Sequence, residues 1–262
     1  MKKAIIDDLP YSKISLGVCA ECNTEKFHCI NDERSIDFIT LCDCEVAKEN
    51  EERSEKLTDS IYGRNKIERN KALCGLRKRD IEEINTIRYM TNKDNIEAYN
   101  ELTKYGTEFN EDVSMGYYIH GTTGTGKSLL VKRLATRVLN KGYSVLFITS
   151  ADLIANIKKR MNEPETRDLK RYAECVDLLI VDDLGVERGT EWEIGELFEI
   201  FNHRWTMSKP IIFTSNLSLD QVKKKYDKHG RIYSRILGGS NKVFTINGAD
   251  KRVEQFKNRV KK

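Results

Sequence analysis

The stretch from Gly121 to Ser128, which reads Gly-Thr-Thr-Gly-Thr-Gly-Lys-Ser, constrains the fold more than any other part of the 262-residue sequence. It matches the phosphate-loop pattern G-x-x-x-x-G-K-[S/T] at every fixed position. An apolar run at 116–120 precedes it and reads as a strand, while an apolar stripe with helical period follows it. Because a phosphate loop joins a strand to a helix, this context favours a nucleotide site over a chance match.

Each part of this loop has a chemical task in a nucleotide site. Glycines let the backbone curl so that amide groups point inward, and the following helix N-terminus adds positive potential near the β-phosphate. Lys127 is predicted to reach the β- and γ-phosphates of ATP, and the Ser128 hydroxyl to bind Mg²⁺. The predicted nucleotide-binding residues are Gly121, Thr122, Thr123, Gly124, Thr125, Gly126, Lys127 and Ser128.

Two adjacent acids follow the apolar run at 176–181 and supply what a magnesium site still needs. A strand ending in Asp182 and Asp183 places the first acid at the carboxyl edge of the sheet, beside the phosphate loop. We predict Asp182 to bind Mg²⁺ together with Ser128, and Asp183 to polarise the attacking water. Acids at a strand end are ordinarily only solvated, but the two motifs together indicate an ATPase in which Lys127, Asp182 and Asp183 are catalytic.

Composition and hydrophobic pattern change along the chain and predict three parts. These are a cysteine-bearing module at 1–50, a charged helical linker at 51–110, and an ATPase domain at 111–262. A chain of this length accommodates one α/β domain and a smaller module. Short apolar runs alternate with amphipathic stretches in the last part, which predicts an α/β fold with a parallel sheet and helices on both faces. The five predicted strands are 116–120, 145–149, 176–181, 211–214 and 243–246.

Three further segments carry a family resemblance: 178–187 (LLIVDDLGVE), 210–217 (PIIFTSNL) and 230–236 (GRIYSRI). With the phosphate loop, they resemble the DnaC/DnaI-type replicative helicase loaders, which are AAA+ ATPases. The IstB-type transposition helper ATPases are similar through the same region, about 115–253. The resemblance implies an AAA+ P-loop fold that uses ATP to deliver a hexameric replicative DNA helicase during the initiation of DNA replication. It also implies single-stranded DNA binding and a homo-oligomer when ATP is bound.

The same resemblance assigns roles to single residues. It makes Asn216 the sensor of the γ-phosphate, although a strand-terminal Asn also caps turns. It makes Arg235 the arginine finger, with Arg231 as the alternative, although both could simply pair with surface acids. Asp183 stands where most AAA+ proteins have Glu, which predicts slow hydrolysis stimulated by assembly or single-stranded DNA. Arg252 is a candidate for a sensor-2-like contact.

Four cysteines form two close pairs near the amino end of the sequence. Cys19-x-x-Cys22 and Cys42-x-Cys44 have spacings that allow four thiolates to surround a tetrahedral Zn²⁺. A segment this short buries too little apolar surface to fold alone, so the metal would supply its folding energy. We predict a structural zinc site, with small buried or reactive thiols as the plainer alternative.

Two other residues could enter this zinc site, because His28 or Cys29 could replace one of the four cysteines. Cys74 and Cys175 lie outside the pattern and read as ordinary thiols. The DnaI-type loaders have an N-terminal zinc-binding domain that contacts the helicase, whereas the IstB-type helpers lack one. The cysteine pairs therefore favour a loader over a transposition helper.

Charge and hydropathy narrow the partners further. The net charge of +4 is too small to indicate nucleic-acid binding by itself, and no run is long and apolar enough for a membrane span. Residues 1–11 lack the apolar core of a signal peptide, so we expect a cytoplasmic protein without a membrane partner. Two clusters could track a DNA backbone or be solvated helix faces: Lys158, Lys159, Arg160, Arg167, Lys170 and Arg171, and Lys223, Lys224, Lys225 and Lys228.

The leading hypothesis is therefore an ATP-dependent helicase loader with ATP, Mg²⁺ and Zn²⁺ as cofactors. A transposition helper ATPase is the first alternative. The second is a nucleotide-binding adaptor with little hydrolysis, which uses its cysteine module to recruit a partner protein.

Overall fold

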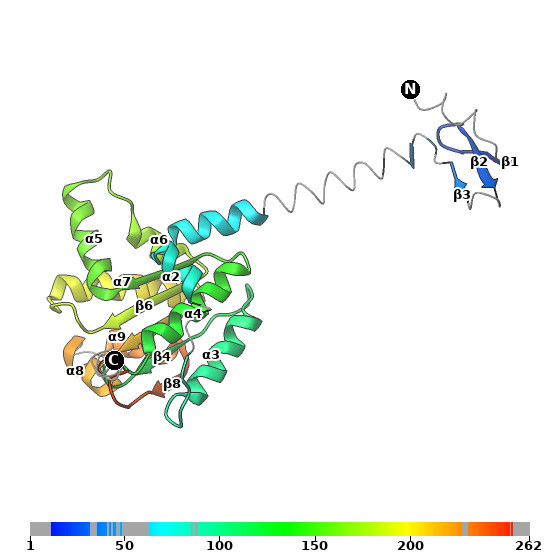
Figure 1. Ribbon diagram of the computed structural model, residues 1–262. Helices are drawn as coiled ribbons and strands as arrows, with labels where there is room; N and C mark the ends of the chain where they lie inside the picture. Colours follow the sequence, from blue (N-terminus) through cyan, green and yellow to red (C-terminus); the bar gives the residue numbers. More distant parts are fainter. Residues whose placement is uncertain are drawn as a thin grey trace. The chain divides into compact units, whose positions relative to one another are not determined.

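The computed structural model describes residues 12–31, 36–40, 42, 44–45, 48, 63–84, 86, 89–226, 230–251 and 253. The chain divides into two compact units, Met1–Arg64 and Asn65–Lys262, and each is described by itself. Figure 1 colours the strands of the first unit blue and runs from cyan to red through the second. None of the helices in the described part of the chain combines the length and apolar character that a membrane crossing requires.

The first unit contains an antiparallel sheet in the order β1-β2-β3, formed by Ser12–Val18, Glu25–Asn31 and Ile36–Ile39. The β1–β2 connection is a tight turn. The Cys19 amide donates to the Thr24 carbonyl at 2.9 Å, and the Cys19 carbonyl accepts from the Asn23 amide at 2.9 Å. Asn23 has a φ of 57° in this turn, a left-handed conformation that Asn tolerates better than most residues. The turn thus folds back sharply around the first cysteine pair.

The second unit is built on a five-stranded sheet in the order β5-β6-β7-β4-β8, and all strand pairs in it are parallel. Parallel neighbours require a crossover for each connection, which the intervening helices supply. The predicted α/β fold with a parallel sheet is confirmed. The strands are β4 Gly116–His120, β5 Val145–Thr149, β6 Leu178–Leu184, β7 Ile211–Ser215 and β8 Ser240–Thr245.

Helices cover both faces of this sheet (Figure 1). Successive strand residues point to opposite faces, and Tyr117 and Tyr118 of β4 accordingly belong to two different apolar clusters. Helices α3 and α4 pack in the first cluster, and α5 to α9 contribute to the second. The helices are α2 Lys78–Glu83, α3 Ile96–Glu108, α4 Lys127–Asn140, α5 Ser150–Asn162, α6 Leu169–Cys175, α7 Glu191–Thr206, α8 Leu219–Tyr226 and α9 Arg231–Gly238.

Helix α7 shows how local sequence defines these elements. Its first residue follows Thr190, whose side chain accepts from the Glu193 amide while the Glu193 carboxylate accepts from the Thr190 amide at 3.1 Å. This reciprocal capping box satisfies two of the amides that a helix N-terminus leaves open. The helix then buries Leu197, Ile200 and Phe201 against the sheet.

The structure differs from the predicted linker at 51–110. Helix α3 belongs to the second unit and buries Leu102 and Tyr105 in its core. A Cβ on Gly106 would lie 2.7 Å from a Leu134 methyl, so this glycine lets α3 approach α4 closely. The buried face of α3 also includes Ala98, so small and aromatic residues share it with Leu102. Residues 51–62 lie outside the described residues.

Candidate nucleotide site and cysteine cluster

The phosphate loop connects β4 to α4 and requires glycine at three positions. Gly121, Gly124 and Gly126 have φ values of 138°, 75° and 98°, which residues with a Cβ rarely adopt. A Cβ would also meet the Ile246 carbonyl oxygen at 2.1 Å from Gly121, and the Asp250 carboxylate at 1.9 Å from Gly124. The curled backbone that the motif predicts is therefore present, and its glycines are needed both for conformation and for space.

Lys127 is the first residue of α4, and its ammonium group lies in the mouth of the loop. The Nζ atom donates to the Gly121 carbonyl at 2.9 Å, to the Thr122 carbonyl at 2.8 Å and to the Asn216 Oδ1 at 2.9 Å. Asn216 follows β7, so two residues separated by 89 positions meet at the carboxyl edge of the sheet. The predicted sensor residue thus lies against the predicted phosphate-binding lysine.

Ser128 and Asp182 face each other with 3.0 Å between Oγ and Oδ1. Asp182 is only 5% exposed and also accepts a short hydrogen bond from the Thr214 hydroxyl. Burial raises the pKa of Asp182, and the negative Asp183 adds to this, while the hydrogen bonds from Thr214 and Ser128 oppose it. A hydroxyl beside a carboxylate is the hard oxygen donor set that Mg²⁺ prefers, so these residues fit the predicted metal.

Thr214 was not predicted as a site residue from the sequence, although it contacts the predicted metal ligand Asp182. The signal was available, because 211–215 is apolar until its last two residues, Thr214 and Ser215. In the structure β7 lies beside β6, and the Thr214 hydroxyl accepts from the Asp183 amide at 3.0 Å. One side chain therefore contacts both acidic residues.

Asp183 has a left-handed backbone with a φ of 51°, which is uncommon for a residue with a Cβ. The pairing of β6 with β7 shifts register between Val181 and Leu184, so the irregularity lies at the two acids. The Asp183 carbonyl accepts from the Ser150 hydroxyl at 3.2 Å. Strained backbone of this kind clusters at functional sites, where surrounding contacts hold it.

The segment after β8 closes over the phosphate loop, a contact that sequence reasoning missed. Thr122 and Gly248 exchange two hydrogen bonds of 3.0 Å, and the Lys251 amide donates to the Gly124 carbonyl at 3.1 Å. A cavity of about 410 Å³ opens beside it, lined among others by Thr122, Asn216 and Asn247. Burial and the nearby Lys127 lower the pKa of His120, which also lines this cavity.

The two predicted finger residues contact side chains of α7. Arg235 donates from Nε to the Asn202 Oδ1 at 2.8 Å, and its guanidinium carbon lies 4.4 Å from the centre of the Trp205 ring. Arg231 lies 6.0 Å from the centre of the Phe198 ring. The predicted contact by Arg252 falls outside the described residues, as does Lys228 of the second basic cluster.

The basic stretches predicted to contact DNA are largely engaged within their own unit. Lys158 pairs with Glu193 at 2.8 Å, and Lys170 pairs with Glu196 at 2.7 Å and Glu199 at 2.6 Å. Charges compensated in this way attract a phosphate backbone less than open ones do. Further contacts are Lys159 to Glu163, Arg160 to Asp168, Arg167 to the Tyr172 ring, Lys223 to the Tyr233 ring, and Lys225 to the Gly185 and Glu187 carbonyls.

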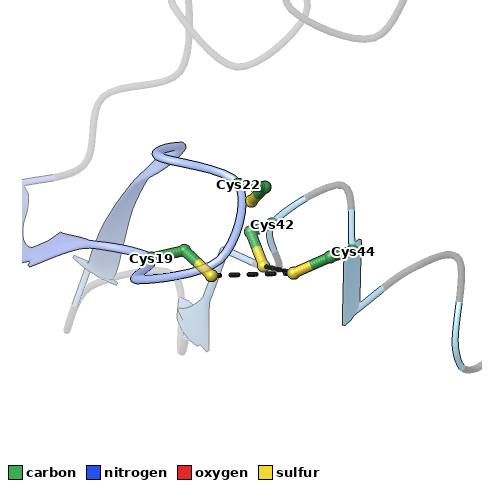
Figure 2. A group of neighbouring side chains, drawn as sticks. All are labelled: Cys19, Cys22, Cys42 and Cys44. Atoms are coloured by element: carbon green, nitrogen blue, oxygen red, sulfur yellow. Dashed lines mark hydrogen bonds between the residues drawn. The ribbon is translucent and has the colours of Figure 1, made fainter.

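The first unit brings the four predicted zinc ligands together (Figure 2). The Sγ atoms of Cys19, Cys22, Cys42 and Cys44 all lie within 4.8 Å of one another. Cys44 is 3.6 Å from Cys19 and 3.0 Å from Cys42, measured between sulfurs. Four thiolates at the usual Zn–S length of about 2.3 Å would be roughly 3.8 Å apart in a tetrahedron, so the cluster fits this metal.

His28 and Cys29 lie on β2 and do not join this group among the residues that the structure describes. Polar neighbours instead surround the four thiols. The Cys22 thiol donates to the Thr24 hydroxyl oxygen at 3.3 Å, and hydrogen bonding between these two side chains is the main reason that the pKa of Cys22 falls to about 6. Hydrogen bonding with the neighbouring thiols, first Cys42, raises the pKa of Cys44. The pKa of Cys19 is lowered as well, mainly by the backbone hydrogen bond from Cys22. Because metal ligands bind as thiolates, a lowered pKa at two of the four cysteines favours metal uptake.

The sheet order, the phosphate loop after β4, the acidic end of β6 and Asn216 after β7 together define an ATPase domain of the AAA+ type. More specifically, the chain belongs to the family of IstB-like ATP binding proteins, which matches residues 31–257. The predicted resemblance to the DnaC/DnaI-type loaders is also confirmed by the relatives that the chain matches.

Two curated relatives illustrate this. The replicative helicase loader DnaI of Bacillus subtilis (strain 168) is 24% identical over 218 residues, which cover 78% of this chain and 66% of the relative. The replicative helicase loader DnaC of Escherichia coli (strain K12) is 27% identical over 129 residues, covering 48% of this chain and 52% of the relative. The chain thus spans less than two thirds of the length of these relatives.

Solved structures show the same fold. The crystal structure of DnaI has a TM-score of 0.57 at 22% identity, with 70% of this chain and 100% of that chain covered. The crystal structure of the DnaC helicase loader has a TM-score of 0.56 at 22% identity, with 65% of this chain and 99% of that chain covered. The replication initiator DnaA bound to AMPPCP and single-stranded DNA has a TM-score of 0.54 at 23% identity, with 66% of this chain and 53% of that chain covered.

Proposed function

We propose that this protein is an ATP-dependent helicase loader that binds single-stranded DNA and delivers a hexameric replicative helicase during replication initiation. The observation that carries the proposal is the cluster of four cysteine sulfurs within 4.8 Å, in a unit separate from an ATPase domain. The resembling transposition helpers lack such a module. The curated relatives DnaI and DnaC, both replicative helicase loaders, support the same assignment.

In this proposal the ATP site works as a switch. Lys127 neutralises the β- and γ-phosphates, and Ser128 and Asp182 hold Mg²⁺, which neutralises phosphate charge when bound. Asp183 orients the attacking water and Asn216 contacts the γ-phosphate from the end of β7. An Asp at position 183 is one methylene shorter than Glu, so its carboxylate lies farther from the water and hydrolysis is slow. Assembly or single-stranded DNA then stimulates turnover.

The amino-terminal unit has a different task in the proposal. Cys19, Cys22, Cys42 and Cys44 bind Zn²⁺, and the folded unit, predicted at 1–50, docks on the helicase. ATP binding brings subunits together as a homo-oligomer on single-stranded DNA, and hydrolysis resets the complex. The two units therefore hold the two partners, helicase and DNA, of one loading reaction.

A loading assay with the full chain tests this function. A hexameric replicative helicase and circular single-stranded DNA are mixed with the protein and ATP, and DNA-bound helicase is measured after gel filtration. We expect the intact protein to raise the bound helicase several-fold, Cys42→Ser to abolish the increase, and Cys175→Ser, at an exposed thiol outside the cluster, to retain it. Equal loading with and without the intact protein would exclude the loader function.

The family match over residues 31–257 favours one second candidate, a transposition helper ATPase. A helper of that kind acts without the helicase, so it predicts ATP turnover that depends on DNA but no helicase delivery. An adaptor with little hydrolysis predicts no increase in turnover when single-stranded DNA is added. Measuring ATP turnover alongside helicase delivery therefore separates all three functions.

A further inference from the structure

One face of α7 is aimed at Arg235 of α9. Phe198, Asn202 and Trp205 are spaced by four and then three residues, so their side chains line up along the helix. Asn202 accepts the Arg235 Nε hydrogen bond at 2.8 Å, and the guanidinium carbon lies 4.4 Å from the Trp205 ring centre and 6.0 Å from that of Phe198. Three side chains from a neighbouring helix thus hold one half-buried guanidinium.

The end of α9 is shaped to accept this tryptophan. A Cβ on Gly238 would lie 3.2 Å from the indole Nε1 of Trp205, closer than most side-chain contacts allow. Glycine therefore lets the indole ring lie against the carboxyl end of α9, where its face meets Arg235. A planar guanidinium held by a ring face and a hydrogen bond loses rotational freedom before any ligand arrives.

The location of Arg235 separates it from the ATP site of its own subunit. It lines a cavity of about 420 Å³ together with Met115, which precedes β4, and Ile211, which begins β7. These are the amino ends of parallel strands, whereas the phosphate loop and Asn216 lie at their carboxyl ends. Arg235 therefore faces away from the nucleotide that its own subunit binds.

The hydrogen bonding of Arg235 leaves its terminal nitrogens open. Its Nε is taken by Asn202, and neither Nη makes a hydrogen bond to the described residues. Two Nη groups presented side by side match the oxygens of a phosphate better than a single flexible cation does. The two Nη groups, which suit a phosphate oxyanion, are thus the part of the guanidinium that is not used within the subunit.

We infer that Asn202 and Trp205 are positioning residues that hold Arg235 ready for the γ-phosphate of ATP bound to a second copy of this chain. The inference rests on the proposed function, because it takes Arg235 as the arginine finger of an ATP-bound oligomer. Asn202 sets the rotation of the guanidinium through Nε, and Trp205 covers one face of its plane. Both act through Arg235 and do not touch the nucleotide.

A mixed-subunit ATPase assay tests this inference. An acceptor, Arg235→Ala, binds ATP but offers no finger, and an excess of a donor, Lys127→Ala, offers a finger but binds no ATP. Each is inactive alone, and we expect the mixture to hydrolyse ATP. Adding Asn202→Leu or Trp205→Leu to the donor should lower the mixture's kcat about tenfold at unchanged KM, because a misplaced finger loses alignment rather than substrate affinity. Trp205→Phe, which keeps a ring face, should restore most of the rate.

The controls separate this inference from the function on which it rests. Met207→Ala in the donor changes an exposed apolar side chain two residues after Trp205 and should leave the rate unchanged. Circular dichroism and thermal unfolding of each donor show that it is folded. If the unmodified donor fails to restore hydrolysis, the finger role of Arg235 fails and takes the inference with it. If that donor works and the Asn202→Leu and Trp205→Leu donors work equally well, only the positioning role is wrong.

Discussion

Each of the two units of this protein is stabilised in a different way. In the first, Ile14, Leu16, Val18 and Ile39 are each more than half exposed, although strands usually bury such residues. In the second, apolar clusters cover both faces of a five-stranded sheet. A unit that leaves its apolar strand residues in solvent gains little from the hydrophobic effect, so the proposed zinc site would be the main source of its stability. The ATPase unit has a core sufficient for itself.

Removal of the metal should have the largest effect and should break only the first unit. Structural zinc contributes on the order of 10–16 kcal/mol of apparent binding free energy in small domains, so a chelator should unfold the cysteine unit entirely. Hydrogen exchange of the full chain should then show loss of protection in β1 to β3 and none in β4 to β8. Elemental analysis that finds no zinc in the untreated protein would contradict the comparison.

A buried cation in the second unit supplies the next largest effect. Arg204 is fully buried, with Nη hydrogen bonds of 2.7 to 2.8 Å to the carbonyls of Ala173, Val176 and Pro210. Burial lowers the pKa of Arg204, and the negative Asp177 opposes this.

Arg204→Met should therefore cost about 3–5 kcal/mol, because the carbonyls lose their donors inside the unit. Urea unfolding measures the loss, and the exposed Arg188→Met is the control. Zinc content should be the same in both variants. A drop in zinc content with Arg204→Met would mean that the units do not stand independently.

In the nucleotide site, a substitution should change ATP affinity rather than the stability of the fold. Lys127→Ala removes a buried ammonium that reaches across to Asn216, and charge-assisted contacts to phosphates of this kind are worth about 1.5–3 kcal/mol each. A fluorescent-ATP titration should show affinity reduced by roughly 100-fold or more. Lys159→Ala, on the exposed face of α5, should bind as the intact protein does. Unchanged affinity of Lys127→Ala would remove the nucleotide-site assignment.

The smallest effect should be a gain in stability. The folded-state pKa of Asp182 is raised above its ordinary 3.8, mainly by burial, so its ionised form destabilises the unliganded protein. This penalty is present at neutral pH, fades as pH falls through the raised pKa, and is absent below 3.8.

Asp182→Asn should therefore increase the free energy of unfolding by roughly 1 kcal/mol at pH 7 and by less in acid, while ATP hydrolysis is lost. Urea unfolding at both pH values measures it, with the exposed Asp94→Asn as the control. A gain that is equal at both pH values, or equal in the control, would contradict burial as its cause.

Sequence reasoning succeeded where a pattern is local. The phosphate loop, the acidic strand end and the alternation of strands with helices each depend on neighbouring residues, and the structure contains all of them. It was less successful for α3, whose close approach to α4 depends on the missing Cβ of Gly106, a feature that an apolar period does not record. The basic stretches also read differently once Lys158 and Lys170 had acidic partners from α7.

The sequence by itself determined the class of chemistry, because the fixed spacing of a glycine loop, a lysine and paired acids already specifies a phosphate and magnesium site. It also predicted the four cysteines that the structure groups together, but it left open whether His28 or Cys29 replaces one of them. Only the tertiary structure decided what surrounds these groups: Thr214 on Asp182, the segment after β8 on the phosphate loop, and α7 on Arg235. Such contacts join residues many positions apart, and packing of strands and helices selects them, so no local spacing records them.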